Sequence, residues 1–269
     1  MTAPLLELDR VTKRFGRVVI AEDLSLAVGA GDVVGIVGPN GAGKTSLFGL
    51  ISGDLAPGAG EIRFAGRTVT KLDAAARCRL GVGRTYQVPR PFGDMTVFEN
   101  LLVAAQQGGG LRRRASYTAA VGALERTGMS AQANVPAERL GLLQRKRLEL
   151  ARALATQPTL LLLDEVAGGL TDPEVAQLVE IIRGVNAEGT AVIWIEHVVR
   201  ALTAVVRRLI CLAGGTFVGD GEPATVLADP AVREVFLGTE VTAALAGGSL
   251  EAPSTVNRDG AAGAERSQP

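Results

Sequence analysis

Three short apolar runs recur along the chain, at Asp32 to Val37, Thr159 to Leu163 and Ala191 to Ile195. Uninterrupted apolar runs of this kind are typical of parallel strands that are buried on both faces. Between the last two runs lies Glu174 to Val185, where apolar residues recur at helical spacing. Because strands that alternate with helices need crossover connections, the pattern predicts a doubly wound α/β fold.

Other segments depart from this alternation. Leu5 to Val11, Val18 to Val28 and Gly60 to Val69 are shorter pieces around the first run, and they predict an antiparallel β flank that makes the fold mixed at its edge. From Val88 to Thr156 the pattern is largely helical. We therefore expect a mostly parallel sheet with an antiparallel flank and a helical subdomain inserted at roughly 88–156.

One domain accounts for most of the chain. A length of 269 residues suits a doubly wound protein that folds as one unit, which we place at 1–238. The remaining stretch, 239–269, consists mainly of Gly, Ala, Ser, Pro and scattered charge. Such a segment buries too little apolar surface to offset its ordering entropy, so we predict a disordered tail there.

Composition narrows the functional classes. Hydrophobic residues make up 47% and aromatics only 4%, which suits an aliphatic α/β core. Lys plus Arg and Asp plus Glu both total 28, so no net charge favours binding to nucleic acid. Cys78 and Cys211 have no metal-site spacing, which fits a reducing cytoplasm. No apolar run approaches the ~18 to 20 residues that span a bilayer, so we expect membrane association only through partners.

A glycine-rich segment directly follows the first buried run and precedes an apolar helical pattern. The segment consists of Gly38, Pro39, Asn40, Gly41, Ala42, Gly43, Lys44 and Thr45, and Ser46 comes next. It satisfies the phosphate-loop pattern GxxxxGK[ST] in the required context of strand, loop and helix. Backbone N–H groups in such a loop point at phosphate oxygens, the lysine contacts the β and γ phosphates, and the threonine holds Mg²⁺. The alternative is a glycine-rich turn that matches by chance in a chain with 34 glycines.

Polar residues also follow the other two runs. Asp164 and Glu165 end the second run, and His197, the only histidine, follows the third. Because a doubly wound sheet binds its ligand at the carboxyl ends of its strands, we expect these residues to face the phosphate loop. Asp164 would bind Mg²⁺ through water, Glu165 would polarise the attacking water as general base, and His197 would contact the γ-phosphate. Without the loop, the acidic pair could equally cap a helix, and a lone histidine is more often structural.

The phosphate loop, the acidic pair and the histidine follow one another in this order along the chain. In this, the chain resembles the ATP-binding subunits of ABC transporters, from about Leu5 to Gly238. The resemblance implies a P-loop NTPase (RecA-like) fold. It also implies that Phe15 stacks on adenine and that His197 is the switch histidine. Gln87 matches the family's glutamine loop, whose residue senses Mg²⁺ and the γ-phosphate and links to the membrane subunit.

The helical insertion carries the family's signature segment in an altered form. Where the family usually has Leu-Ser-Gly-Gly-Gln, the chain has Leu140 followed by Gly141, Leu142, Leu143 and Gln144. In the family this segment closes over ATP bound to the other subunit of a dimer. Here the serine hydroxyl is missing and two bulky leucines replace glycines. Since helix N-terminal N–H groups still bind phosphate, we expect weakened or altered closure rather than a dead site.

Two further departures follow the acidic pair. Val166 stands where the family usually has proline, and Thr171 stands where most members have aspartate. The resemblance therefore does not carry that aspartate's cross-dimer contact over to this chain.

Within the family, several stretches resemble the branched-chain amino-acid (Liv-type) uptake branch, whose relatives import urea and short amides. They are Gly83 to Gln87, Met95 to Leu101, Ile195 to His197, the Gly-Leu-Thr at 169–171, and the ending from Gly221 to Gly238 within a segment at roughly 213–238. The resemblance thus implies an ATPase that uses ATP and Mg²⁺ in an importer for branched-chain amino acids or related small amides.

The implied partners are a second ATPase subunit, integral membrane permease subunits and, indirectly, a solute-binding protein, at the cytoplasmic face of the membrane and without nucleic acid. One alternative is a soluble ABC ATPase that acts on DNA or ribosomes. Such chains usually carry long coiled coils or tandem copies, and this chain has neither. Another is a regulatory nucleotide sensor with weak turnover, which the altered signature keeps open.

Overall fold

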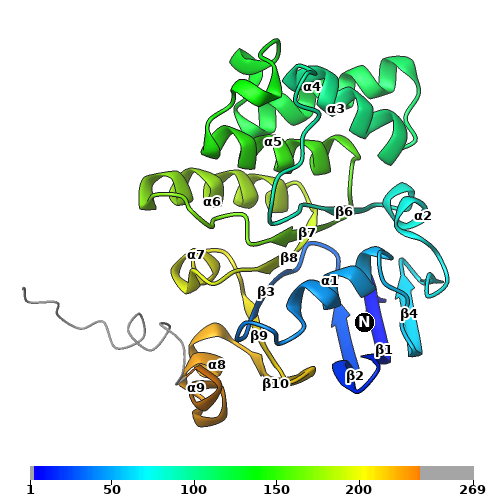
Figure 1. The fold of residues 1–269 in the computed structure, drawn as a ribbon, viewed down its shortest axis with the longest axis vertical. Coiled ribbons are helices and arrows are strands. Elements are labelled where there is room, and N and C mark those ends of the chain that lie inside the picture. The colour runs from blue at the N-terminus through cyan, green and yellow to red at the C-terminus, as the bar shows by residue number, and fades with distance from the viewer. Residues whose placement is uncertain (1–2, 237–269) are drawn as a thin grey trace, which may run out of the picture.

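A central six-stranded sheet organises the protein (Figure 1). The structure is a computed structural model and describes residues 3–236. The strands run in the order β10-β9-β3-β8-β7-β6, and all neighbours are parallel except β10, which pairs antiparallel with β9. Their bounds are β3 (Val33–Val37), β6 (Val82–Arg84), β7 (Leu160–Asp164), β8 (Ala191–Ile195), β9 (Arg208–Ala213) and β10 (Thr216–Gly221). Strands β3, β7 and β8 are the three apolar runs, and all their residues are buried. The predicted doubly wound α/β fold is confirmed.

The antiparallel strands form a second sheet of their own. It has the order β2-β1-β4-β5 and consists of β1 (Leu6–Phe15), β2 (Val18–Val28), β4 (Ala59–Phe64) and β5 (Arg67–Thr68). The antiparallel flank was predicted correctly, but it does not extend the parallel sheet, whose antiparallel edge is β10 instead. Buried positions are interspersed with half-buried or exposed ones along β1 and β2, as expected of strands with one solvated face. The Glu22 N–H donates to the Gly215 carbonyl oxygen at 2.8 Å and links the two sheets.

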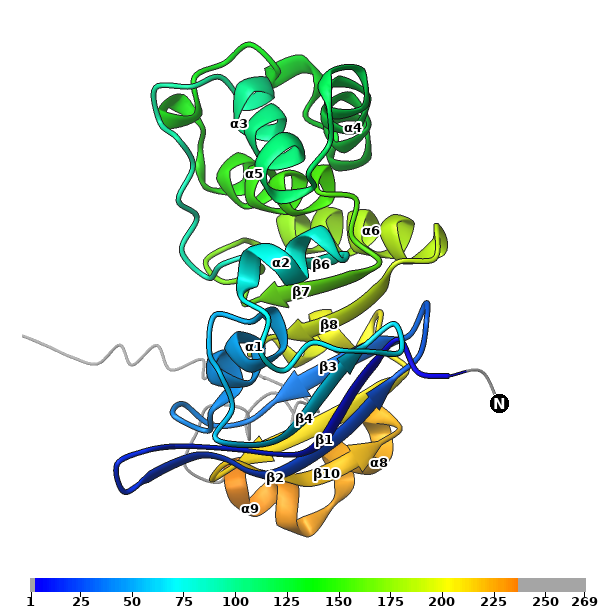
Figure 2. The same ribbon diagram turned by 90° about the vertical axis from the view of Figure 1, so that its right-hand side faces the viewer.

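The segment between β6 and β7 is helical, as predicted, and Figures 1 and 2 show its three α-helices at the end of the molecule away from the antiparallel sheet. A capping box at Thr96 and Glu99 begins the first of them. The inserted elements are α3 (Val97–Val103), the π-helix η1 (Ala104–Gly108), α4 (Arg113–Thr127), the 3-10 helices η2 (Ser130–Gln132) and η3 (Ala137–Arg139), and α5 (Leu142–Ala155). The other helices are α1 (Lys44–Ser52), α2 (Ala74–Arg79), α6 (Asp172–Ala187), α7 (Val199–Thr203), α8 (Pro223–Ala228) and α9 (Pro230–Phe236).

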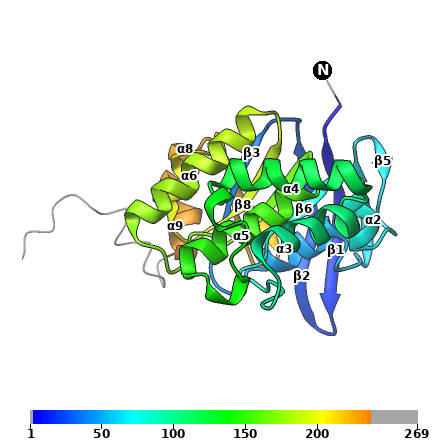
Figure 3. The same ribbon diagram turned by 90° about the horizontal axis from the view of Figure 1, so that it is seen from above.

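Two hydrophobic cores cover the two faces of the central sheet. Alternation along β3 divides its side chains between them: Val34 and Ile36 belong to the core shared with α1 and the antiparallel sheet. Val33 and Val37 belong to the core shared with the inserted helices and α6. Figure 3 shows α3, α4, α5 and α6 lying over the strands. The fold therefore has three layers, with the central sheet in the middle.

Two predictions concern the end of the chain and the membrane. The predicted disordered tail at 239–269 and the domain end at 238 lie outside the described residues. Within residues 3–236, no helix combines the length and the apolar character needed to cross a membrane.

A buried arginine holds the end of α1, the helix that follows the glycine-rich loop. Arg77 of α2 is only 1% exposed, and its Nη1 donates to the carbonyl oxygens of Leu50 at 2.6 Å and Ile51 at 2.9 Å. Its other donors reach the carbonyl oxygens of Leu72 and Thr70. Because the last carbonyls of a helix lack partners within the helix, this cation satisfies them and complements the helix dipole.

We expect Arg77→Met to lower the free energy of unfolding by about 3 kcal/mol, since the buried carbonyl oxygens at the end of α1 lose their donors. Urea denaturation followed by circular dichroism measures this loss. The exposed Arg67 of β5 provides the control, and Arg67→Met should change stability by less than about 0.5 kcal/mol. Equal losses for the two variants would contradict the capping role of Arg77.

Candidate functional site

Most of the residues singled out by sequence converge at the carboxyl ends of the parallel strands. The loop from Gly38 to Gly43 follows β3, Glu165 follows β7, His197 follows β8, and Gln87 follows β6. Because β3, β8, β7 and β6 are consecutive parallel neighbours, their following segments meet at one sheet edge. There they border a cavity of about 590 Å³ lined by Ile20, Asn40, Gly41, Ala42, Gly43, Lys44, Thr45, Ser46, Gln87, Glu165 and His197.

Glycine is required at two positions of this loop by close backbone contacts. A Cβ on Gly38 would lie 2.0 Å from the Leu212 carbonyl oxygen, and a Cβ on Gly43 would lie 2.5 Å from that of Ile20. The φ angle of Gly43 is 102°, in the left-handed range. Gly43 is also the N-cap of α1 and supplies no side-chain cap, so the N–H groups of the first turn remain available to an anion.

Lys44 is the buried cation of the loop. It is 6% exposed, and its Nζ donates to the carbonyl oxygens of Gly38 at 2.8 Å and Pro39 at 3.0 Å. Burial lowers the pKa of Lys44, while the nearby carboxylates of Glu165 and Asp164 raise it. The two hydrogen bonds hold the ammonium group over the loop. An anion bound there would stabilise the charged form of Lys44.

Three predicted residues form one hydrogen-bonded group at the cavity. The Gln87 amide donates from Nε2 to Oε2 of Glu165 at 2.5 Å. The His197 Nε2 lies 2.6 Å from the other carboxylate oxygen, Oε1. Both oxygens of Glu165 are thus engaged by the residues that follow β6 and β8.

Asp164 lies deeper, at the end of β7, and is 1% exposed. Its Oδ2 accepts from Nη2 of Arg84 at 3.3 Å, and its N–H donates to the Thr85 hydroxyl at 3.1 Å. Burial raises the pKa of Asp164, and Arg84 opposes this shift. Among the described residues, its buried Oδ1 has no hydrogen-bond partner.

These groups fit a nucleotide with Mg²⁺. The glycine cradle, the N-terminus of α1 and the buried ammonium are suited to phosphates, since all present positive charge or N–H donors. Mg²⁺ requires oxygen ligands, and the Thr45 hydroxyl at the cavity would offer one. The unpartnered Oδ1 of Asp164 would offer another, although Asp164 itself does not line the cavity.

Some predicted residues lie apart from the cavity. Phe15, at the end of β1, is 52% exposed with Lys13 over its ring, and the cavity wall from β2 is Ile20. The altered signature segment begins α5: Gly141 is its N-cap without a side-chain cap, and Leu142 is 50% exposed. Neither segment lines the cavity of its own subunit.

Sequence reasoning missed three charged residues around the site: Lys146 and Glu196 are buried, and Arg84 is half-buried. Arg84 holds Asp164, while Glu196 accepts from the N–H groups of Ala167 at 2.6 Å and His197 at 3.1 Å. Burial raises the pKa of Glu196. A charge at the end of a buried strand was the available signal for Arg84 and Glu196, whereas Lys146 lies in a helix and gave none.

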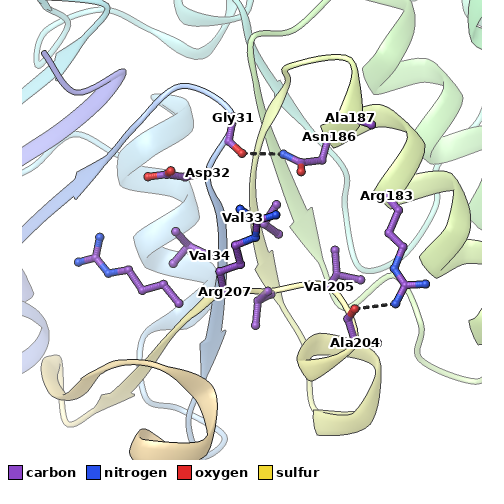
Figure 4. A pocket seen from close by; sticks show the side chains of 12 residues that line it. Gly31, Asp32, Val33, Val34, Arg183, Asn186, Ala187, Ala204, Val205 and Arg207 are labelled. Atoms are coloured by element: carbon purple, nitrogen blue, oxygen red, sulfur yellow. Dashed lines mark hydrogen bonds between the residues drawn. The ribbon is translucent and has the colours of Figure 1, made fainter. Parts of the chain in front are cut away.

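A larger cavity of about 820 Å³ lies at the opposite edge of the sheet, where β3 and β9 begin (Figure 4). Several of its polar side chains already have partners. Asn186 donates to the Gly31 carbonyl oxygen at 2.8 Å, Arg183 to that of Ala204 at 2.7 Å, and Arg208 pairs with Asp220. A doubly wound sheet binds ligands at the carboxyl ends, so the smaller cavity is the candidate site.

Comparison with known proteins identifies the family of the chain. A family model described as ABC transporter matches residues 21–168. The chain is 36% identical over 253 residues to the high-affinity branched-chain amino acid transport ATP-binding protein LivG of Salmonella typhimurium, covering 88% of this chain and 99% of that protein. It is 34% identical, with the same coverage, to BraF of Pseudomonas aeruginosa, which has the same description. The lipopolysaccharide export ATP-binding protein LptB of Acidithiobacillus ferridurans is 32% identical, covering 88% and 98%.

The fold also matches solved structures. A crystal structure of an ATP-binding cassette of an ABC transporter in its ADP conformation aligns with a TM-score of 0.81 at 28% identity, covering 88% of this chain and all of that chain. The chain therefore belongs to the ABC transporter family. It is an ATPase subunit of that family, with the fold of the ATP-binding cassette.

We expect Gly38→Ala to lower ATP affinity by at least about tenfold, because the new Cβ would overlap the Leu212 carbonyl and force the loop to move. Titration calorimetry measures the affinity. Gly122 of α4 is the matched control, since a Cβ there meets nothing within 4 Å. Gly122→Ala should retain ATP affinity and gain about 0.5–1 kcal/mol of stability. If the Gly38→Ala variant folds and its affinity for ATP is unchanged, the proposed binding of phosphate by the loop from Gly38 to Gly43 is contradicted.

Proposed function

We propose that the chain binds ATP with Mg²⁺ at this sheet edge and hydrolyses it. The observation that carries the proposal is the Glu165 carboxylate, held between Gln87 and His197 at the cavity that the glycine loop and Lys44 also line. The phosphates would lie on Gly38 to Ser46, with Lys44 at the β and γ phosphates. Phe15 would stack on the adenine ring, as the resemblance to ABC transporter ATP-binding subunits implies.

Mg²⁺ would be held by Thr45 directly, by Asp164 through water and by Gln87, and it would neutralise charge on the phosphates. Glu165 would accept the proton of the attacking water as general base. Each of its oxygens makes one contact, to Gln87 or to His197, and keeps a further lone pair that would accept from the water. Release of Gln87 or His197 from Glu165 would let the released side chain contact the γ-phosphate.

The catalytic unit would be a dimer of two ATPase subunits arranged head to tail. Each subunit would place its Gly141 to Gln144 segment over the nucleotide of the other. The uncapped N-terminus of α5 supplies N–H groups for this contact, while Leu142 fills the space that glycine leaves open in the family's usual signature. Closure would thus depend on backbone amides rather than a serine hydroxyl.

The transport reaction would be uptake of branched-chain amino acids or related small amides. This choice rests on the likeness to LivG and BraF across nearly their whole length and on the Liv-type stretches in the sequence. The partners would be integral membrane permease subunits docked near Gln87 on the cytoplasmic face, with a solute-binding protein on the other side. Nucleotide-driven closure would move the permease because ATP binds the closed state more tightly.

We expect Glu165→Gln to lower the steady-state rate of ATP hydrolysis by about 100-fold or more while ATP binding remains, because the amide cannot accept the proton. Phosphate release and titration calorimetry measure the two quantities. Glu174→Gln, on the exposed capping box of α6, provides the control and should leave turnover unchanged. Wild-type turnover no faster than that of Glu165→Gln would favour a nucleotide sensor over a motor.

Membrane extracts should yield permease subunits with the tagged chain, and proteoliposomes made from the complex with its solute-binding protein should take up leucine when ATP is supplied. Glu165→Gln in the same complex should abolish uptake, because hydrolysis resets the dimer. Radiolabelled urea and a lipopolysaccharide export assay serve as comparisons. Recovery of nucleic acid instead of permease subunits would contradict a transport function.

A further inference from the structure

One face of α5 contacts the segment that carries Gln87. Lys146, Glu149 and Arg152 are spaced three residues apart and therefore lie on one side of the helix. The Nζ of Lys146 donates to the Gln87 carbonyl oxygen at 3.0 Å, and Nη1 of Arg152 donates to that of Arg90 at 3.0 Å. The Arg152–Glu149 ion pair, at 2.9 Å, joins two members of this face.

Lys146 makes a second contact that reaches the candidate general base. Its Nζ donates to the carbonyl oxygen of Glu165 at 3.2 Å. The same ammonium therefore joins the backbones of Gln87 and Glu165, whose side chains meet at the cavity. Lys146 itself is only 5% exposed and does not line the cavity.

Glu165 needs such support because its backbone is unusual. Its φ angle is 48°, in the left-handed region that residues with a Cβ rarely adopt. The Glu165 N–H donates to the Ile195 carbonyl oxygen at 2.9 Å, and its carbonyl accepts from Lys146 at 3.2 Å and, at 3.4 Å, from the Gly168 N–H. Both polar groups of this residue's backbone are thus fixed, one by β8 and one by α5, and such conformations persist only where neighbours enforce them.

We propose that Lys146 is a positioning residue for ATP hydrolysis, which holds the backbones of Glu165 and Gln87 so that their side chains meet at the cavity. The inference rests on the proposed role of Glu165 as general base. Loss of Lys146 would leave the Glu165 carbonyl with only the long contact from the Gly168 N–H, at 3.4 Å, and would remove the direct contact between α5 and Gln87. Because α5 also begins at the Gly141 segment, the same contact would transmit a shift of that helix to Glu165.

The test compares Lys146→Met, which keeps the aliphatic stem but removes the donor, with Lys146→Arg, which keeps a cation. Arg147→Met is the matched control, since this neighbouring cation of α5 bonds instead to Gln177 of α6. The measurements are kcat and KM for ATP, equilibrium ATP affinity, thermal stability, and amide hydrogen exchange of residues 84–90 and 163–170 without nucleotide.

For Lys146→Met we expect kcat to fall at least about tenfold while ATP affinity stays within about twofold, since a mispositioned base affects chemistry more than binding. Hydrogen exchange should accelerate in both segments. Lys146→Arg should recover kcat to within about threefold and restore slow exchange. Arg147→Met should leave exchange in 163–170 unchanged.

Wild-type kcat and exchange in Lys146→Met would overturn the inference. So would equal effects of Lys146→Met and Arg147→Met, or a loss of ATP affinity that parallels the loss of kcat, because these indicate a general packing role. Failure of the proposed function is recognised by a different result, namely that Glu165→Gln retains turnover. In that case, hydrogen exchange in residues 163–170 would still show whether Lys146 holds the backbone of Glu165.

Discussion

The parallel register of β3, β8 and β7 is the constraint on which the site depends. Ile195 of β8 pairs with Ile36 of β3 on one side and with Asp164 of β7 on the other. The three strands therefore end at the same level, and the residues that follow them share one edge. A register shift in any strand would remove its residue from the group, so the buried apolar core that fixes the register also fixes the geometry of the candidate site.

Buried charge is concentrated at this same edge. Lys44, Asp164 and Glu196 are all nearly inaccessible, and burial shifts the pKa of each toward its neutral form. Opposite charges and backbone groups compensate these costs, as Arg84 does for Asp164. Perturbed pKa values of this kind cluster where proteins bind and transform charged ligands. A site of fixed, desolvated donors and acceptors suits phosphate chemistry, in which positioning and electrostatics supply most of the catalysis.

The inserted helices connect this edge to the surface that partners would use. Helix α5 starts with the altered signature segment and contacts Gln87 and Glu165 through Lys146. A single rigid helix thus joins the surface that would face a second subunit to the candidate base. If Lys146 positions Glu165 as proposed, α5 would couple that surface to the site during the ATPase cycle.

The sequence by itself determined the three buried strands, the inserted helices, the phosphate loop and the residues that meet at the cavity. The local sequence pattern was sufficient to predict these features, because each depends on residues that are close in sequence. They are the period of the apolar residues, the spacing of the glycines, and the order of strand, loop and helix. It could not separate the two sheets, since alternation does not say which strands pair, and it placed the antiparallel flank at the edge of the parallel sheet. Only tertiary structure decided that Arg84 holds Asp164 and that Lys146 joins two site loops. Those contacts link residues far apart in sequence, 80 positions for Arg84 and Asp164, and in the case of Lys146 they end on backbone carbonyls that every residue type provides.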